Sequence, residues 1–345
     1  MFSKLTKKFS NKIGIDLGTA NTLVYLSEHG IVVNEPSIVA MNRKTERIVA
    51  VGNTAREMLG RNPEHLTVIR PLSEGVISDF EIAEEMIGYF INRAEEMDRR
   101  FFRPTVLIGI PSGVTNVEQR AVFDAAYHAG VRECFLIEEP MAGAIAEGLP
   151  IHDATGSMVI DIGGGTTDIA VISLDGIAQS KNLKVAGDVF NQDIMLFFRE
   201  KLHMLIGERS ADDIKRAIMS ADSTTRLETQ AFGRDMMTGL PKQITVKDTD
   251  IMEATQASME ILLDSVAEVL EKTPPELVSD ISRAGIHLFG GGALIRGIGD
   301  LISRHIGIPV HVSAHPLESV ARGTGIILEN LSEYLPVLIK PEDHD

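Results

Sequence analysis

One short pattern occurs twice in this chain, and it constrains the fold more than any other feature. The first copy runs from Ile15 to Thr19 as IDLGT, and the second runs from Ile160 to Thr167 as IDIGGGTT. Each copy lies between two apolar stretches typical of strands, so each predicts a β-hairpin with a glycine turn. Such a turn lets backbone N–H groups converge on an anion, and an Asp at the strand end can hold a hydrated divalent cation.

A single Asp-Gly turn is ordinary hairpin chemistry, and either copy alone favours that interpretation. Two copies reverse the preference, because hairpins that face each other from opposite halves of a protein would clamp a polyphosphate. Asp161 follows Asp16 by 145 residues, about the length of one domain. The pair therefore predicts a duplicated architecture with a nucleotide between the halves.

Composition limits the partners of the chain. Its 345 residues carry 49 acidic and 33 basic side chains, a net charge of −16. The average surface would repel duplex nucleic acid or an anionic membrane, so we expect no nucleic-acid partner and only local membrane contact. Cys134 is the single cysteine, which excludes an intramolecular disulfide and fits a reducing cytoplasm.

Buried strands alternate with helices along most of the chain, which predicts a largely parallel α/β sheet. Ser78 with Glu81, and Thr115 with Glu118, have the spacing of capping boxes and predict the starts of two helices. Two turn-rich stretches, 31–76 and 220–249, interrupt the pattern, and we expect each to form a small inserted subdomain.

Two further motifs have the composition of a ligand site. Glu139 lies between a buried strand and Pro140, at the edge of the sheet where ligands bind in α/β proteins, and its carboxylate could orient an attacking water. Helix capping explains it nearly as well. Gly290, Gly291 and Gly292 follow another strand, where glycines allow a flat ligand to approach the backbone, and a simple tight turn is the alternative.

Apolar residues near the N-terminus form a different pattern. Phe2, Leu5 and Phe9 recur at helical spacing with lysines between them, as expected of a short helix in a membrane interface. A frayed terminus is the alternative, and the residues alone favour neither. Phe101 and Phe102 form another apolar pair, beside arginines, for which core packing is the default interpretation.

In order along the chain, the first hairpin, the Glu-Glu-Pro connection, the second hairpin and a Gly-Gly-Gly-Ala turn resemble the superfamily of actin, sugar kinases and heat-shock ATPases. Longer motifs narrow the resemblance to the MreB family of bacterial actins and cover practically the whole chain. These motifs are IDLGTAN from Ile15, NEPS from Asn34, IRPL from Ile69, EEPMA from Glu138, IDIGGGTTD from Ile160 and KTPPELVSDI from Lys272.

This resemblance implies an α/β, actin-like (ribonuclease H-like) fold of duplicated lobes, with four subdomains around a central cleft for ATP and Mg²⁺. Each lobe then has one larger and one smaller subdomain. The expected boundaries are 1–12 for an amphipathic membrane-binding N-terminus, 13–33 and 74–149 for subdomain IA, 34–73 for IB, 150–188 and 250–345 for IIA, and 189–249 for IIB.

The resemblance also implies roles for individual residues. Glu139 and Thr166 would position the hydrolytic water, and Asp16 and Asp161 would hold Mg²⁺ through water molecules. Residues expected around the nucleotide are Thr19, Ala20, Asn21, Gly163, Gly164, Gly165, Thr166, Gly187, Asp188, Asp212, Asp213, Ile214, Lys215, Gly290, Gly291, Gly292 and Ala293. Residues expected to enter the membrane are Phe2, Leu5, Phe9, Phe101 and Phe102.

The function implied is that of a slow ATPase that forms double filaments at the cytoplasmic, inner face of the plasma membrane. Its expected partners are further copies of the chain, that membrane, and cell-wall elongation and morphogenesis proteins. Its expected role is to maintain rod shape by organising peptidoglycan synthesis. A plasmid-segregating actin-like filament ATPase and an actin-fold sugar kinase remain the alternatives, and DNA-adaptor binding or turnover of a sugar would distinguish them.

Two positions depart from the family pattern. Asn191 stands where the family usually has an acid, and Asp213 stands where a basic residue is more usual. We therefore expect altered ribose or base contacts. The stretch 220–249 also diverges, at a place where longitudinal filament contacts are expected, so we expect polymerisation to be retained with changed partner preference.

Overall fold

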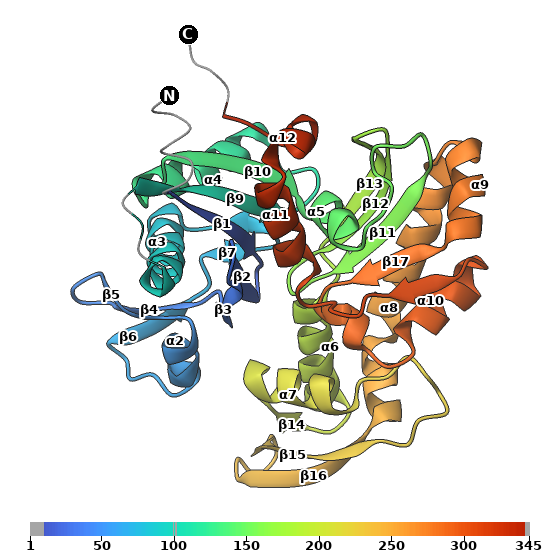
Figure 1. Ribbon diagram of the computed structural model, residues 1–345. Helices are drawn as coiled ribbons and strands as arrows, with labels where there is room; N and C mark the ends of the chain where they lie inside the picture. The colour runs from blue at the N-terminus through green and yellow to red at the C-terminus, as the bar shows by residue number, and fades with distance from the viewer. Residues whose placement is uncertain (1–9, 99, 101, 342–345) are drawn as a thin grey trace.

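A computed structural model describes residues 10–98, 100 and 102–341 of the chain. Two five-stranded sheets dominate it, one from each half of the sequence, and they lie side by side with helices packed against them (Figure 1). The first sheet contains β1 (Ser10–Leu17), β2 (Asn21–Leu26), β3 (Gly30–Pro36), β9 (Phe102–Ile110) and β10 (Glu133–Glu138). The second contains β11 (Ser157–Ile162), β12 (Thr167–Ser173), β13 (Gly176–Leu183), β17 (Ile286–Phe289) and β18 (Val310–Val312).

The two sheets have the same topology. Their strand orders are β10-β9-β1-β2-β3 and β13-β12-β11-β17-β18. In each sheet, the first three strands along the chain form an antiparallel meander, and the last two extend the sheet in parallel from the first strand. The duplicated α/β architecture predicted from the paired hairpins is therefore confirmed.

Helices pack against the large sheets and against the smaller strand groups that extend from them. In the first half they are α2 (Asn53–Met58), α3 (Phe80–Met97), α4 (Asn116–His128) and α5 (Glu139–Ala146). In the second half they are α6 (Gly187–Glu200), α7 (Glu208–Ile218), α8 (Asp248–Lys272), α9 (Pro275–Ala284), η1 (Gly291–Leu294), α10 (Ile298–Ile306), α11 (Ser319–Glu329), α12 (Leu331–Tyr334) and η2 (Leu335–Val337).

The helix starts agree only in part with the capping signals. Thr115 and Glu118 form the predicted capping box at the start of α4. The box predicted at Ser78 is wrong, because Asp79 is the N-cap of α3 and accepts a hydrogen bond from the N–H of Ile82. The Ser78 hydroxyl instead donates to the carbonyl of Pro71 at 3.0 Å, so it holds the preceding turn.

Two small sheets extend from the same side of the large ones, in the lower part of Figure 1. They fall within the expected subdomains IB (34–73) and IIB (189–249). The first contains β4 (Val39–Asn42), β5 (Arg47–Val51) and β6 (Leu66–Ile69), and the second contains β14 (Met204–Leu205), β15 (Glu228–Asp235) and β16 (Pro241–Lys247). A short hairpin of β7 (Leu72–Ser73) and β8 (Val76–Ile77) follows the first of them.

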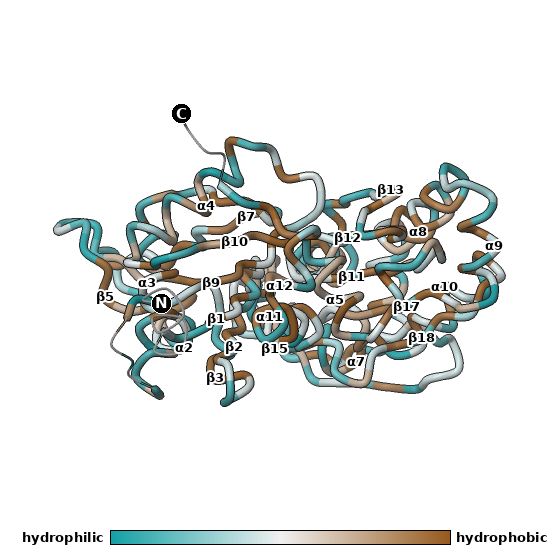
Figure 2. Tube along the Cα trace, turned by 45° about the horizontal axis from the view of Figure 1, so that its top comes forward, coloured by the Kyte–Doolittle hydropathy of each residue, from teal (hydrophilic) through white to brown (hydrophobic). Residues whose placement is uncertain are grey.

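The hydrophobic core continues from one half into the other. Figure 2 shows apolar residues along the strands of both large sheets and hydrophilic ones in the outer turns. Between the sheets, Leu107 of β9 packs in one cluster with Val159 of β11 and with residues of α5 and α11. A Cβ on Gly323 of α11 would lie 1.9 Å from the carbonyl oxygen of Ala142, so glycine permits this close helix contact. The halves therefore share a packed junction, about which they could hinge.

The N-terminal end of the described chain is a strand. Ser10 pairs with Phe102 in the sheet, and its hydroxyl donates to the carbonyl of Arg103 at 2.6 Å. The expected amphipathic segment 1–12 thus overlaps β1 at its last three residues, while Phe2, Leu5 and Phe9 lie outside the described residues. Within the described ranges, every helix is too short or too polar to span a bilayer.

Candidate functional site

A cavity lies between the two halves, and both glycine turns line it. Its volume is about 490 Å³, within the range typical of small-molecule sites. Gly18 to Asn21 contribute from the β1–β2 turn, and Gly163 to Thr166 contribute from the β11–β12 turn. The two turns predicted to clamp one ligand thus share one cavity.

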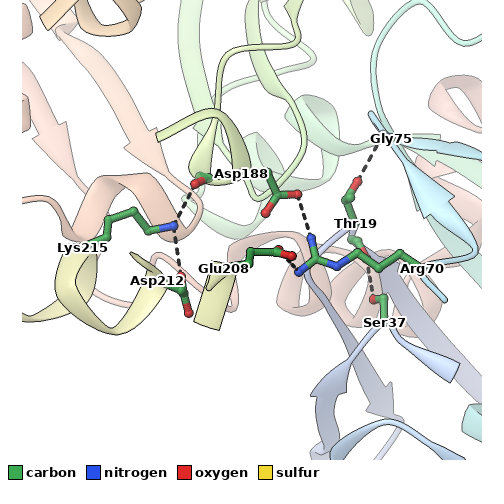
Figure 3. Close-up of polar contacts among 10 residues, drawn as sticks. Thr19, Ser37, Arg70, Gly75, Asp188, Glu208, Asp212 and Lys215 are labelled. Carbon is green, nitrogen blue, oxygen red and sulfur yellow. Dashed lines mark hydrogen bonds and ion pairs between the residues drawn. The ribbon is translucent and has the colours of Figure 1, made fainter. Parts of the chain in front are cut away.

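Side chains behind the first turn fix its shape. The Ser37 hydroxyl donates to the carbonyl of Gly18 at 2.5 Å, and the Thr19 hydroxyl accepts a hydrogen bond from the N–H of Gly75 at 3.1 Å (Figure 3). The strand register keeps Asp16 opposite Leu23, one step before the final pair of the hairpin, Leu17 and Thr22. These contacts preorganise the turn before any ligand is bound.

The second turn is held by the start of α6. The N–H groups of Gly187 and Asp188 donate to the carbonyls of Gly163 and Gly164, at 3.2 and 2.8 Å. In the part of the chain that the structure describes, the N–H groups of Gly164 and Gly165 have no acceptor, and neither do those of Thr19 and Ala20. Unpaired backbone donors from two turns form a cradle suited to phosphate oxygens.

The turns also touch each other. A Cβ on Gly164 would lie 2.5 Å from the Cβ of Ala20, and a Cβ on Gly165 would lie 2.7 Å from the hydroxyl oxygen of Thr19. No larger residue fits at either position without moving the opposite turn, so the glycines allow the two halves to close.

Four carboxylates gather beside the turns. Asp16 is the second-last residue of β1, Glu139 begins α5, and Asp161 and Asp168 face each other across the β11–β12 hairpin. Burial raises the pKa of Asp16 to about 7. Burial, followed by repulsion from the neighbouring acids, raises the pKa values of Glu139 and Asp161 well above their usual range. Uncompensated negative charge of this kind favours a bound cation.

Of the four carboxylates, Asp168 accepts the most hydrogen bonds. Burial raises its pKa to about 6, although Asn182 and the N–H of Ser112 donate hydrogen bonds that lower it. The Ser112 N–H belongs to the first half of the chain and lies 2.8 Å from the carboxylate, so Asp168 also joins the two halves.

The donor set suits a hydrated divalent cation. Over residues 10–98, 100 and 102–341, no three acidic, imidazole or thiol groups converge closely enough to ligate a metal ion directly. Carboxylates at the ends of β1 and β11 could instead accept hydrogen bonds from the waters of Mg²⁺, a cation that dehydrates reluctantly. The residues present therefore fit a water-mediated magnesium site.

One face of α7 forms the far end of the cavity. The Lys215 ammonium donates to the carbonyl of Gly187 at 2.8 Å and pairs with Asp212 at 3.0 Å (Figure 3). Arg216 pairs with the same carboxylate at 2.8 Å. Burial alone would raise the pKa of Asp212, but these two cations keep it below its usual range. The cavity is therefore acidic beside the turns and mixed in charge along α7.

The third glycine cluster lies directly against the second hairpin. Gly290 has a φ of 82°, and a Cβ there would lie 2.2 Å from the Oδ1 of Asp161. A Cβ on Gly292 would lie 2.2 Å from the Cγ2 of Ile162. Leu294 and Leu317 are exposed nearby and line the same cavity, which gives a flat ligand apolar surfaces to contact.

The structure brings most of the predicted site residues to this cavity. Those that line it are Asp16, Thr19, Ala20, Asn21, Glu139, Asp161, Gly163, Gly164, Gly165, Thr166, Gly187, Asp188, Asp212, Lys215, Gly290, Gly291 and Gly292. Asp213, Ile214 and Ala293 do not line it. Asp213 is exposed on another face of α7, and Ile214 and Ala293 are buried in the core, because a run of adjacent helical residues cannot share one face.

Other lining residues were missed by the sequence reasoning. Arg216 and Met219 follow Asp212 at helical spacing, which is a signal that could have found them. Asp168, which does not line the cavity but joins the acidic cluster beside it, is the cross-strand partner of Asp161, as the length of the turn indicates. Gly75, Arg296 and Pro316 come from connections far away in sequence, and the sequence gives no comparable signal for them.

The two departures from the family pattern lie outside the main cavity. Asp213 is exposed to solvent. Asn191 is buried, its Oδ1 has no hydrogen-bond partner, and it lines a smaller neighbouring cavity of about 70 Å³. Phe102, from the predicted membrane set, is 42% exposed at the start of β9, so it does not take the default core position. Phe101 lies outside the described residues.

Comparison with known proteins identifies similar chains along almost the full length. Residues 10–335 match the family described as MreB/Mbl protein. The chain is 46% identical over 324 residues to the cell shape-determining protein Mbl of Bacillus cereus, covering 94% of this chain and 97% of that relative. It is 46% identical over 338 residues to the cell shape-determining protein MreB of Escherichia coli, covering 95% and 96%.

Solved structures give the same result for the fold. The structure of MreB5 of Spiroplasma citri bound to ADP superposes with a TM-score of 0.89 at 36% identity, over 94% of this chain and 98% of that one. The AMPPNP-bound structure of the same protein has a TM-score of 0.88 at 35% identity, with the same coverage. The MamK double helical filament, at 21% identity, shares the fold with a TM-score of 0.78 over 93% and 99%. The expected actin-like fold is therefore confirmed.

Proposed function

The chain belongs to the MreB/Mbl protein family, and on that premise we propose that it is an ATP-dependent, membrane-associated filament protein that maintains rod cell shape by organising peptidoglycan synthesis. One observation carries the proposal: the two turns with unpaired N–H groups come from opposite halves of the chain and border one cavity. A ligand held by both turns stabilises the closed form by the difference between its affinities for the closed and open forms. Assembly can then depend on the nucleotide.

We assign ATP as the nucleotide. The unpaired N–H groups of Thr19, Ala20, Gly164 and Gly165 would bind its phosphates. The face of α7 and the glycines at 290–292 would hold the nucleoside. The structural relatives that bind ADP and AMPPNP support this assignment.

We assign hydrolysis to Glu139, with Thr166. The Glu139 carboxylate is buried at the start of α5, beside the turns, and no cation pairs with it in the described part of the chain. A raised pKa brings a carboxylate closer to the range in which it can accept a proton from water at neutral pH. The Thr166 hydroxyl would help to orient the same water. A single positioned carboxylate and few other catalytic groups suit slow turnover.

Mg²⁺ is the metal that the donors fit. Asp16 and Asp161 would hold it through water, and the ion would neutralise charge on the phosphates. The same residues, without nucleotide, keep buried carboxylates close together, so the cation also compensates their repulsion.

Filament formation and membrane attachment complete the proposal. We assign the four subdomains at the boundaries expected from the sequence, and we place the protein in the cytoplasm, peripheral on the inner face of the plasma membrane. Further copies of the chain would form double filaments, and cell-wall elongation and morphogenesis proteins would bind them. Residues 1–9, together with Phe101 and the exposed Phe102, would contact the lipid.

Electron microscopy of the purified protein on anionic lipid tests this function. With ATP and Mg²⁺ we expect paired filaments lying on the membrane, and few or none without nucleotide. Filaments that form equally well without nucleotide, or that bind DNA adaptors rather than lipid, would contradict the proposal. ADP formation that requires a sugar would support a sugar kinase instead.

A further inference from the structure

A second, smaller cavity lies beside the main one, between the first half of the chain and the second. Its volume is about 70 Å³, which leaves room for a few water molecules or one small ion, but not for a nucleotide. One wall comes from α2 and the end of β3, and the other from the starts of α6 and α7 (Figure 1). The residues that line both cavities are Ala20, Asn21, Asp188, Asp212 and Arg216.

The acids in the wall of this smaller cavity all have cationic partners. Arg70 pairs with Asp188 and Glu208, at 3.2 and 2.5 Å (Figure 3). Arg216 pairs with Asp212 at 2.8 Å. These three carboxylates and two arginines belong to the lining, so their charges largely offset one another.

Two further arginines in the wall have no such partner. Arg56 and Arg209 line the cavity, and neither forms an ion pair within the residues that the structure describes. Arg56 belongs to α2 and Arg209 to α7, so one guanidinium comes from each side. Like charges on facing walls repel each other, and an anion between them would remove that repulsion. Arginine also offers planar, paired N–H donors that suit phosphate oxygens.

The start of α7 favours an anion at the same place. Its first two residues, Glu208 and Arg209, line the cavity. The N-cap, Gly207, supplies no side-chain hydrogen bond to the helix. The first N–H groups of a helix have no acceptor within it, and they carry the positive end of the helix dipole.

A buried amide completes the lining. Asn191 is 4% exposed, and its Oδ1 has no hydrogen-bond partner in the described part of the chain. It lines the smaller cavity and not the main one. An amide offers two N–H donors, whereas the acid that is usual in the family at this position would offer none and would add a fourth carboxylate to the wall. The departure at Asn191 therefore makes this cavity better suited to an anion.

We propose that the smaller cavity binds one phosphate-sized oxyanion between Arg56, Arg209 and Asn191, as a second site distinct from that of the nucleotide. This site goes beyond the proposed function, because the phosphates of the nucleotide are assigned to the glycine turns. None of the three residues lines the main cavity, so the oxyanion binds while the nucleotide site is filled.

Equilibrium dialysis with labelled inorganic phosphate tests the site. The full-length protein is first saturated with a non-hydrolysable ATP analogue and Mg²⁺, so that phosphate cannot enter the main cavity. We expect phosphate to bind one site per chain with millimolar affinity. Sulfate should compete, because it has the same shape and similar charge, and chloride at equal ionic strength should compete much less.

Substitution of the two arginines should reduce the affinity. Arg56→Ala and Arg209→Ala should each weaken phosphate binding about 3- to 10-fold, because each removes a charged donor that water partly screens. Arg61→Ala is the matched control. Arg61 is an exposed arginine shortly after α2, it lines neither cavity, and it forms no ion pair within the described ranges, so its variant should bind as the unaltered chain does.

Asn191→Asp tests the amide with almost no change in shape. The new carboxylate should weaken phosphate binding at least about 10-fold, because it replaces donors by a like charge beside the anion. Gln192→Glu is the control, since it adds the same charge at the next position, which is exposed and lines neither cavity. Its phosphate affinity should stay within about twofold of the original.

The bound phosphate has two possible sources, solution and ATP hydrolysis, and a single turnover with γ-labelled ATP distinguishes them. Faster loss of label from Arg209→Ala than from the unaltered chain assigns the product of hydrolysis to the site. Equal loss assigns phosphate from solution, which the dialysis measures.

The proposal is overturned if phosphate binds only when the nucleotide site is empty, or if Arg56→Ala and Arg209→Ala bind it as the unaltered chain does. If Asn191→Asp does not fold, the arginine variants carry the test, since Arg209 is exposed and Arg56 partly so. If the unaltered chain binds no nucleotide, the proposed function fails. The same variants titrated with phosphate alone would still test the second site, because the substituted residues lie outside the main cavity.

Discussion

Gly164 and Ala20 face each other across the cleft, so closely that no methyl group fits on Gly164 without moving one of the two turns. A Cβ on Gly164 would lie 2.5 Å from the Cβ of Ala20, well inside van der Waals contact. Each residue belongs to a turn whose N–H groups have no acceptor in the described part of the protein. The contact therefore sets how closely the two phosphate cradles approach each other. A side chain added at Gly164 should separate them.

Gly164→Ala should weaken nucleotide binding at least about 10-fold, because the added methyl forces the turns apart and overpacking typically costs about 1–3 kcal/mol. Titration with a fluorescent ATP analogue measures it. Ala20→Gly in the same background removes the opposing methyl and should recover most of the loss. Gly207→Ala is the control, since its Cβ would meet no atom within 4 Å. Equal affinities in all these variants would show that the turns do not determine binding.

Glu139→Gln should slow phosphate release about 10²- to 10⁴-fold while ATP binding and filaments persist, because the amide keeps the shape but cannot accept the proton. A single-turnover phosphate assay gives the rate, and Glu139→Ala should behave similarly. Glu138→Gln changes the adjacent carboxylate, which does not line the cavity, and should retain the rate within about threefold. Release at the original rate from Glu139→Gln would remove this residue from its assigned role.

Deleting residues 1–9 and replacing Phe102 with Ser should each reduce pelleting with anionic vesicles, and together they should nearly abolish it, while ATP binding stays intact. Deletion should stop before Ser10, since its hydroxyl donates to Arg103 within the sheet. Phe232→Ser is the matched control, because Phe232 is 62% exposed on β15. If the doubly altered protein pellets as before, the membrane surface lies elsewhere.

Acid should destabilise the second half of the chain, because it protonates the carboxylate of Glu268. A hydrogen bond from Lys181, together with an ion pair to Lys272 at 2.6 Å, lowers the pKa of Glu268 to about 2. A carboxylate whose pKa is lowered by folding stabilises the folded state at pH values above 4.5, its pKa in the unfolded chain. This contribution is lost as the pH falls from 4.5 to about 2, the pKa in the folded state. Thermal unfolding between pH 6 and about 2.5 should therefore show a smaller loss for Glu268→Gln, which lacks the group that titrates. Glu271→Gln, on the exposed surface three positions after Glu268, should follow the unaltered chain.

Much of the fold could be predicted because its signals are local. Apolar runs such as that of β11, in which every residue is buried, identify strands, and the repeated glycine turn identifies the duplication. The capping box at Thr115 was predicted and is present, since both partners lie within one turn of helix. At Ser78 the same pattern failed, because a competing partner, the carbonyl of Pro71, takes the hydroxyl.

The site could be predicted only where its residues follow motifs. The run 212–215 was expected around the nucleotide, but a helix turns by 100° per residue, so Asp212 and Lys215 reach the cavity while Asp213 and Ile214 do not. Arg70 illustrates what sequence alone could not provide. It lies 118 residues before its partner Asp188, and nothing in either local pattern indicates that the two side chains meet.

The most direct test of the account is a crystal structure of the chain with a non-hydrolysable ATP analogue and Mg²⁺. The distances that decide it run from the β- and γ-phosphate oxygens to the backbone nitrogens of Thr19, Ala20, Gly164 and Gly165. We predict hydrogen-bond distances, about 2.7–3.2 Å, to at least one nitrogen of each turn. A triphosphate bound to one turn alone, or bound outside the shared cavity, would contradict the claim that both halves of the molecule grip the same ligand.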